Sequence, residues 1–189
     1  VAAEEGAEGA SEGWHERPTV CVFMCKSNSA RSIAAECIAK SSYKTTEGAI
    51  EFYSAGTNNS GLIKAPVQRA LTRAGYHVAD LHSKSIQMLL QQLQGARIDY
   101  LITMCCEAEG ELKRNVSVRE ALKLGDFAPC GVQILHLPFE VPAPTDSCRR
   151  QGLTGCEPEA NVHYDDMVTR IEAFVADLPE NLKKAQPLL

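Results

Sequence analysis

Short apolar runs alternate with amphipathic segments along most of this 189-residue chain. The apolar runs predict strands over about 19–25, 50–55, 98–104 and 132–137. Apolar residues at helical spacing predict helices over about 29–41, 65–75 and 84–94, and a last helix over about 164–178. Because alternating strands and helices favour a parallel sheet covered on both faces, the pattern predicts an α/β domain with three layers and a four-stranded parallel sheet.

The first predicted strand ends at Cys25, and a polar loop and a helix follow it in the segment CKSNSARS, residues 25–32. Backbone N–H groups of such a loop form an anion-binding nest, and the start of a helix adds unpaired N–H groups and a positive field that favours a thiolate. Arg31 can grip two oxygens of a tetrahedral anion, and Ser32 can donate a hydrogen bond to the sulfur. We therefore expect an enzyme that attacks a phosphate-like group with sulfur. The expected oxyanion-binding residues are Lys26, Ser27, Asn28, Ser29, Ala30 and Arg31.

A cysteine six residues before an arginine can also arise by chance. The alternative interpretation is a buried strand cysteine followed by a solvated arginine. Here the pair lies directly between an apolar strand and a helix-like segment, which favours the catalytic interpretation. In parallel sheets, active sites lie at the carboxyl ends of the strands, and four polar residues occur at or just past such ends. They are Cys25, Ser54, Cys105 and Glu140.

Composition narrows the class of protein. The hydrophobic fraction of 44% and the charged fraction of 23% are ordinary for a globular protein, and the net charge of −5 with no basic stripe argues against a nucleic-acid partner. Residues 1–18 are rich in Ala, Gly and Glu and are expected to form a disordered acidic tail before a domain over 19–189. No apolar stretch is long enough for a membrane span, so we expect no membrane partner.

Cysteine usage bears on the compartment. Eight cysteines without the spacing of a small disulfide-rich domain indicate a reducing compartment, and we expect a cytoplasmic monomer. No secretory leader opens the chain, but it begins at Val1, which leaves open an organelle-targeting peptide removed earlier. No standard ligand spacing marks a metal site, so none is expected.

Several motifs together carry a family resemblance. The chain resembles the low-molecular-weight tyrosine phosphatase superfamily, and within it the arsenate reductases most, from about residue 19 to residue 178. The resemblance implies the low-molecular-weight phosphatase fold and the reduction of arsenate to arsenite, an arsenic-detoxifying reaction. The motifs are CKSNSARS at 25–32, YSAGT at 53–57, Pro66, HSK at 82–84, ITMC at 102–105 and HLPFEVP at 136–142.

The resemblance also implies roles for individual residues. Cys25 attacks arsenic while Arg31 and the loop amides hold the oxygens, and Cys105 matches the cysteine that resolves the adduct. Cys106 or glutathione is the alternative second thiol, and two merely packed thiols are a further possibility. The family's thioredoxin-coupled members carry a third cysteine, and the matching position lies near Leu112 here.

Because no cysteine lies at the position near Leu112, the resemblance favours coupling to glutathione and glutaredoxin. Glutathione is then a co-substrate, no cofactor is tightly bound, and glutaredoxin or thioredoxin is the reductant. The usual Cys-x-Cys of the glutathione branch differs from the adjacent Cys105 and Cys106 of this chain.

The chain departs from the family at the general acid. Relatives place an Asp directly before a proline, where it protonates the leaving oxygen; here Val141 precedes Pro142. Glu140, one residue earlier, is either a replacement acid or a plain loop carboxylate. Losing the acid harms a phosphatase, which expels an alkoxide, more than a reductase, which expels water. A tyrosine phosphatase is nevertheless one alternative function, and a catalytically silent phosphate- or arsenate-binding protein is another.

Two further departures concern the loop's support. Ser27 stands where many relatives have glycine, and a serine is strained there if the position requires a positive φ. Lys84 stands where the potassium-binding relatives have Asp, so its ammonium group either replaces a cation near Asn28 and Glu36 or is solvated.

Overall fold

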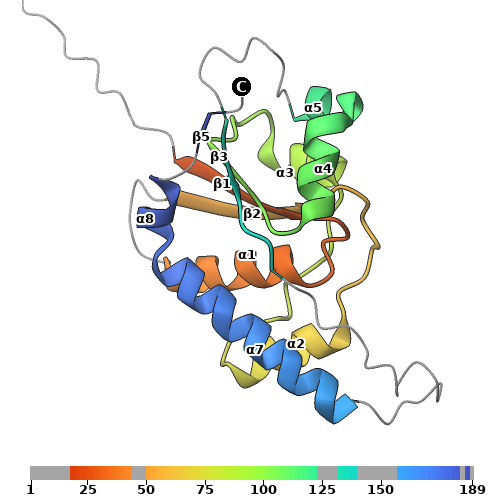
Figure 1. Cartoon of the computed structure of the whole chain (residues 1–189), viewed down its shortest axis with the longest axis vertical. Helices are drawn as coiled ribbons and strands as arrows, with labels where there is room; N and C mark the ends of the chain where they lie inside the picture. Colours follow the sequence, from red (N-terminus) through yellow and green to blue (C-terminus); the bar gives the residue numbers. More distant parts are fainter. Residues whose placement is uncertain (1–17, 44–49, 123–131, 140–156, 184–185, 188–189) are drawn as a thin grey trace, which may run out of the picture.

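The computed structural model describes residues 18–43, 50–122, 132–139, 157–183 and 186–187. Its four parallel strands confirm the expected α/β fold (Figure 1). A two-residue strand β5, Gln186–Pro187, pairs antiparallel with β4 at one edge and was not predicted, because two residues carry no pattern. The parallel strands, in the spatial order β2-β1-β3-β4, are β1 (Thr19–Cys25), β2 (Ile50–Gly56), β3 (Tyr100–Thr103) and β4 (Gln133–His136). The tail expected over 1–18 lies outside the described residues except for Pro18.

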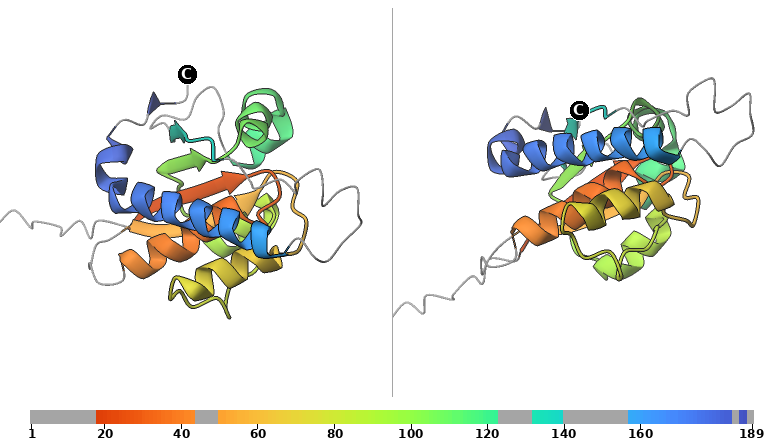
Figure 2. Two further views of the ribbon diagram at one scale, coloured as in Figure 1. Left: turned by 60° about the horizontal axis from the view of Figure 1, so that its bottom comes forward. Right: turned by 90° about the horizontal axis from the view of Figure 1, so that it is seen from below.

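The helices cover both faces of the sheet. On one face, α1 packs on β1 and β2, and α7 packs across α1 and α2; on the other, α3 and α4 pack on the strands and α5 joins them (Figures 1 and 2). None of the helices in the described ranges is long and apolar enough to cross a bilayer. The helices are α1 (Arg31–Ser42), α2 (Ala65–Arg73), α3 (Ile86–Leu93), α4 (Cys106–Arg114), α5 (Val116–Ala121), α7 (Glu157–Ala176) and α8 (Leu178–Leu182).

Strand β1 is the centre of the core. Its residues from Val20 to Cys25 are all buried, because parallel strands lie on both sides of it and helices cover both faces. This burial explains why β1 reads as a continuous apolar run rather than an alternating one. Burial raises the pKa of the Cys21 thiol strongly, so this strand cysteine is an inert packing residue.

The topology places two cysteines side by side. The chain leaves β1 to one side to form β2, then crosses back to form β3 on the other side, so the strand order reverses between β1 and β3. Ligands of open α/β sheets bind at such a point, outside the carboxyl ends of the strands. The register pairs Met24 with Thr103, and the N–H of Met104 donates to the carbonyl of Met24 at 2.8 Å. Cys25 is one residue beyond Met24 and Cys105 is two residues beyond Thr103, so both cysteines lie at this point.

Candidate active site

The segment 25–32 forms a loop around the carboxyl end of β1, with Cys25 only 2% exposed at its start. The Ser32 hydroxyl lies 3.0 Å from the Cys25 sulfur. The side-chain amide of Asn28 donates to the Ser32 oxygen at 2.9 Å. That oxygen already accepts a hydrogen bond, and the Ser32 proton can point at the sulfur. The expected role of Ser32 thus has a geometric basis.

The backbone strain in the loop falls on Asn28 rather than on Ser27. Asn28 has φ of 47°, and Ser27 is not among the residues with positive φ. Asparagine tolerates this left-handed conformation better than most residues do. The substitution of serine for the relatives' glycine at position 27 therefore introduces no such strain.

A buried ion pair supports the loop from behind. The Lys84 ammonium group lies 2.8 Å from a carboxylate oxygen of Glu36, and both side chains are buried. The Ser54 hydroxyl donates to Glu36 at 2.5 Å and accepts from the Asn28 amide at 2.8 Å. The backbone N–H of Lys84 also donates to the Asn28 carbonyl oxygen at 2.6 Å, which fixes the orientation of the amide. The ammonium group thus takes the place near Asn28 and Glu36 that the sequence suggested for it, and it is not solvated.

The Asn28 amide group is the branch point of this network. A carboxylate only accepts, so the Ser54 hydroxyl donates to Glu36 and accepts from the Asn28 amide, which also donates to Ser32. Burial alone would raise the pKa of Glu36, but the ammonium groups of Lys84 and Lys40 outweigh it, so the pKa lies below its usual value of 4.5. The carboxylate is therefore charged at neutral pH and orients Ser54, which in turn helps to hold the Asn28 amide that donates to Ser32.

Replacing Glu36 by glutamine should destabilise the fold by about 3 kcal/mol at pH 7, because it leaves the buried Lys84 ammonium group without its charge partner. Since the folded-state pKa of Glu36 is depressed, its stabilising effect is present above the unfolded value near 4.5 and is lost as pH falls through the folded value. Urea unfolding of wild type and variant between pH 7 and pH 3 measures this difference, which should shrink below about pH 4. Glu51→Gln, at an exposed position of β2, is the matched control and should change stability by less than about 0.5 kcal/mol. A pH-independent difference would contradict the assignment.

Gly56 permits the close approach of the loop to the end of β2. A Cβ built on Gly56 would lie 2.9 Å from the Asn28 nitrogen and from the Lys26 carbonyl oxygen, and both of these are backbone atoms. The segment beyond Gly56 runs along the loop, since the N–H groups of Thr57 and Asn58 donate to the carbonyls of Cys25 and Lys26 at 3.1 and 2.7 Å. The loop is thus held on the side of β2 by its own backbone.

Gly56→Ala should therefore displace the loop and lower turnover by on the order of 10-fold to 100-fold, because the added methyl group meets backbone that cannot rotate away. Steady-state kinetics with the enzyme's oxyanion substrate measures the loss. Gly75→Ala, at the C-terminal end of α2, is the control: its φ of +89° makes alanine strained, but no atom lies within 4 Å of the added Cβ. A rate loss as large in Gly75→Ala would trace the effect to stability rather than to the loop.

Arg31 begins α1 and lies with its guanidinium group at the loop. Its Nη1 donates to the carbonyl of Phe139 at 3.0 Å, which anchors the side chain to the segment after β4. Its Nε is buried and has no hydrogen-bond partner within the described part of the chain. Helix α1 also begins without a side-chain cap, so its first N–H groups are not used by a neighbouring side chain. Unpaired donors and a cationic fork in one place are suited to a tetrahedral oxyanion.

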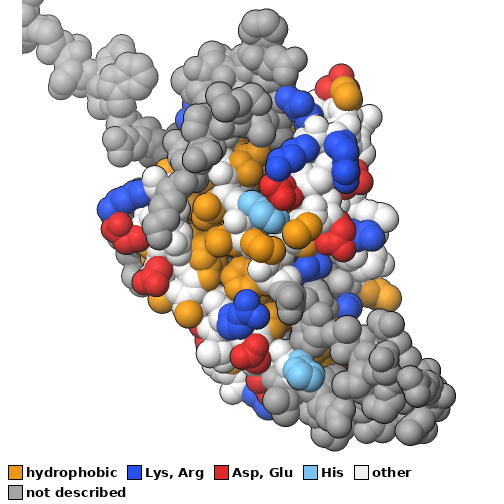
Figure 3. Space-filling view, in the orientation of Figure 1, with side chains coloured by type: hydrophobic (Ala, Val, Ile, Leu, Met, Phe, Trp, Pro, Cys, Tyr) orange, Lys and Arg blue, Asp and Glu red, His pale blue; other side chains and the backbone are white. Residues whose placement is uncertain are grey.

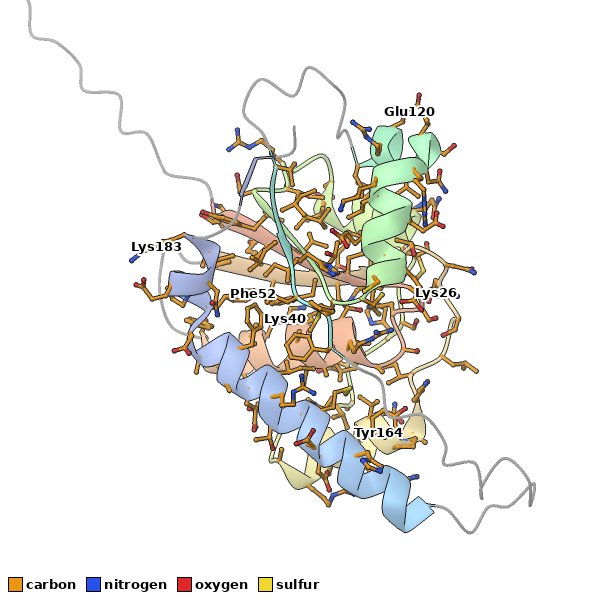
Figure 4. All side chains as sticks on the ribbon, in the orientation of Figure 1. Lys26, Lys40, Phe52, Glu120, Tyr164 and Lys183 are labelled. Carbon is orange, nitrogen blue, oxygen red and sulfur yellow. The ribbon has the colours of Figure 1, made fainter. Side chains whose placement is uncertain are left out.

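Cys105 caps the N-terminus of α4 and faces the loop. Its sulfur accepts the N–H of Ala108 at 3.4 Å, and the backbone N–H of Lys26 also acts to lower the pKa of the thiol. Burial raises the pKa of the Cys105 thiol; the two N–H groups and Arg31 oppose that effect, and the negative charge of Cys25 adds to it. Cys105 is therefore a protonated thiol held beside the nucleophile. Figure 4 shows Lys26 near the start of α4, with its side chain exposed to solvent.

The other residues expected at the site divide into three groups. Ser29 and Ala30 are buried in the loop, as its shape requires. Cys106 is exposed and lies beside His136 rather than in the loop. Glu140 lies outside the described residues, as do Cys148 and Cys156.

Sequence reasoning missed Glu107 and helix α4. Helix α4 buries only two side chains, Ala108 and Leu112, so its apolar pattern is weak. The pKa of Glu107 is lowered chiefly by its own backbone N–H, and further by the Cys105 thiol and the charges of Arg31 and Lys26. Glu107 is therefore a described carboxylate next to the second thiol. Glu107 lies two residues after Cys105, just past the end of β3, and that position could have suggested it as a site residue.

The arrangement combines a nucleophilic sulfur, oxyanion donors and a second thiol. In the described ranges no disulfide joins these cysteines, and no group of three or more His, Cys, Asp or Glu side chains is placed to hold a metal. Such a site can form a covalent adduct between sulfur and a tetrahedral oxyanion and stabilise its charge.

Comparison with known proteins agrees with this chemistry. A model of the low molecular weight phosphotyrosine protein phosphatase family matches residues 20–187. Comparison with curated protein sequences gave no match.

Solved structures share the fold at low identity. A low molecular weight protein tyrosine phosphatase from T. tengcongensis gives a TM-score of 0.58 at 19% identity, over 86% of this chain and 98% of that one. The tyrosine phosphatase Wzb from Escherichia coli K30, solved with sulphate, gives a TM-score of 0.55 at 15% identity, over 88% of this chain and 99% of that one. A thioredoxin-dependent arsenate reductase from Corynebacterium glutamicum gives 0.52 at 17% identity, over 90% of this chain and 64% of that one. Identities this low show the fold alone, so the activity must be argued from the site.

Proposed function

This chain belongs to the low molecular weight phosphotyrosine protein phosphatase family, and we propose that within this family it reduces arsenate to arsenite. The observation that carries the proposal is the buried Cys105 thiol, which follows β3 next to the carboxyl end of β1, where Cys25 lies. A phosphatase needs one nucleophile and water. A reductase needs a second sulfur at this place.

The proposed reaction uses each part of the site once. The Cys25 thiolate attacks arsenic(V), an oxygen leaves as water, and a sulfur–arsenic bond forms. The donors of the loop and Arg31 hold the remaining oxygens. Cys105 then attacks the Cys25 sulfur, the sulfur–arsenic bond breaks, and its electron pair stays on arsenic, which leaves as arsenite. The two thiols are oxidised to a disulfide as arsenic(V) is reduced to arsenic(III).

The electrostatics of the site give these steps their order. While Cys25 is a thiolate, its charge raises the pKa of Cys105 and keeps the second thiol protonated. Once Cys25 is bound to arsenic, that charge is gone, and the N–H groups and Arg31 that lower the pKa of Cys105 are no longer opposed by it. Premature disulfide formation is thus disfavoured until the adduct exists.

Reduction of the resulting disulfide completes the proposed cycle. We propose glutathione with glutaredoxin as the source of electrons, with thioredoxin as the alternative, in a reducing cytoplasm. The proton for the leaving oxygen comes from Glu140 or from a bound water in this proposal.

Arsenate-dependent NADPH oxidation, coupled through glutathione, glutaredoxin and glutathione reductase, tests the proposal. Wild type should turn over, and Cys105→Ala should lose at least about 100-fold, because the adduct is then not resolved internally. Cys21→Ala, which removes a buried strand thiol, is the matched control and should keep its rate. Turnover in Cys105→Ala at the wild-type rate would contradict the role of Cys105.

The tyrosine phosphatase alternative has support of its own, because the solved structures that share this fold include phosphatases. Hydrolysis of p-nitrophenyl phosphate separates the two functions. Efficient hydrolysis that survives Cys105→Ala, without arsenate turnover under either thiol system, would favour a phosphatase. Phosphate binding without either activity would favour the silent oxyanion-binding protein.

A further inference from the structure

A second cysteine–histidine arrangement lies outside the oxyanion loop. Cys106, the first residue of α4, is exposed, and its sulfur lies 4.0 Å from Nε2 of His136. His136 ends β4 and stands opposite Thr103 in the sheet register. The Thr103 hydroxyl lies 2.7 Å from Nδ1 of the ring. The proposed function uses neither Cys106 nor His136.

The ring is held in place on both sides. Thr103 is fully buried and fixes the Nδ1 side, so Nε2 points toward the start of α4. There it lies 3.3 Å from a carboxylate oxygen of Glu109, which also pairs with Lys113 at 2.6 Å. Glu109 and Lys113 are thus charged groups on the α4 side of His136, besides Cys106. They orient an imidazole nitrogen toward the thiol and place a carboxylate where an imidazolium ion would be stabilised.

We propose that Cys106 and His136 form a thiol–imidazole pair that exchanges with low-molecular-weight disulfides of the glutathione type, with His136 holding the proton of Cys106. Two features favour exchange at this thiol: its exposure, and its position at the first residue of a helix, where the dipole stabilises a developing thiolate. Buried Cys21 has neither feature. The inference does not depend on the reduction of arsenate.

The exchange balances without a further reactant. The Cys106 sulfur attacks one sulfur of the external disulfide, the external sulfur–sulfur bond breaks, and a mixed disulfide forms on Cys106. The other half leaves as a thiolate and takes the proton that His136 held. Cys106 is oxidised and the released thiol is reduced.

The described surface near this pair is chemically mixed. Figure 3 shows apolar side chains across the surface between α7 and α4, and charged side chains of both signs over α4 and α5. A peptide disulfide that carries both charges and aliphatic carbon meets complementary groups on that face.

The test uses a Cys25→Ser/Cys105→Ser background, in which neither neighbouring thiol can remove a mixed disulfide from Cys106. Serine is also a good N-cap, so α4 keeps its start. The reduced protein is mixed with glutathione disulfide at pH 7, quenched with acid, and the modified cysteine is mapped by peptide mass spectrometry. Cys106 should be modified faster than Cys21, and His136→Asn should slow its modification by on the order of tenfold or more.

A pH profile separates proton transfer from a structural effect. Near pH 9.5 solvent removes the thiol proton in both proteins, so the difference between the Cys25→Ser/Cys105→Ser parent and its His136→Asn derivative should vanish. His163→Asn, at an exposed position of α7, is the control and should leave the rate unchanged. Equal rates at pH 7, or an equal loss at every pH, would overturn the proposal. Melting temperatures verify folding, and His136→Gln replaces His136→Asn if the latter unfolds.

Discussion

Replacing Cys25 by serine is expected to lower arsenate turnover by on the order of 10⁴-fold or more, and aryl phosphate hydrolysis with it. The sulfur stands at the end of β1, where the Ser32 hydroxyl at 3.0 Å and the network behind it support a thiolate. A serine hydroxyl in the same place receives the same hydrogen bonds but is not ionised near neutral pH. Steady-state rates with arsenate and with p-nitrophenyl phosphate measure both losses.

The variant should keep its binding site while losing its chemistry. The loop amides and Arg31 do not change, so inorganic phosphate should bind to Cys25→Ser within a few-fold of wild type by calorimetry. Cys21→Ala again controls for the loss of a thiol from the same strand. Substantial turnover in Cys25→Ser would show that another residue is the nucleophile.

The local part of the site could be predicted from the sequence. Cys25, Arg31 and Ser32 lie within eight consecutive residues, and the strand before them is an unbroken apolar run. A strand, loop and helix in immediate succession fix their own geometry, so β1 and α1 occur where the pattern placed them. The meeting of Cys25 and Cys105 also followed from the pattern, because parallel strands bring their carboxyl ends to one edge.

The remaining contacts depend on residues far apart in the chain. Glu36 and Lys84 are 48 residues apart, and only the family resemblance, not a pattern in either neighbourhood, suggested that they lie close together. Gly56 matters only because another segment's backbone lies against it. His136 and Cys106 come together through the pairing of β3 with β4 and the packing of α4. Such contacts follow from tertiary structure, which no local pattern encodes.

The fold and the activity therefore rest on different residues. The matched family and the shared fold are consistent with phosphatases and with an arsenate reductase alike. What distinguishes the two chemistries is the thiol at position 105 and the groups that control its proton. In this chain a carboxylate, Glu107, lies beside that thiol.

Arg31→Lys should lower kcat/KM by about 10²-fold to 10³-fold, although it keeps the positive charge. The guanidinium group uses one nitrogen, Nη1, to anchor itself to the Phe139 carbonyl and leaves its other donors for the oxyanion. A lysine ammonium group is a single point of charge: if it donates to Phe139, it no longer reaches two oxygens in one plane. Most of the loss should fall on kcat, because charge builds up on these oxygens in the transition state.

A surface substitution of the same kind controls for the change of side chain. Arg73 on α2 pairs with Asp165 on α7 at 2.6 Å, and both side chains are close to half exposed. Arg73→Lys keeps that pair and should leave the rate within about twofold, since exposed ion pairs contribute little. If Arg31→Lys acted only through charge, it would behave like Arg73→Lys, and the planar arrangement of donors would not be what the site uses. A loss confined to KM would instead mean that Arg31 binds substrate and transition state equally well.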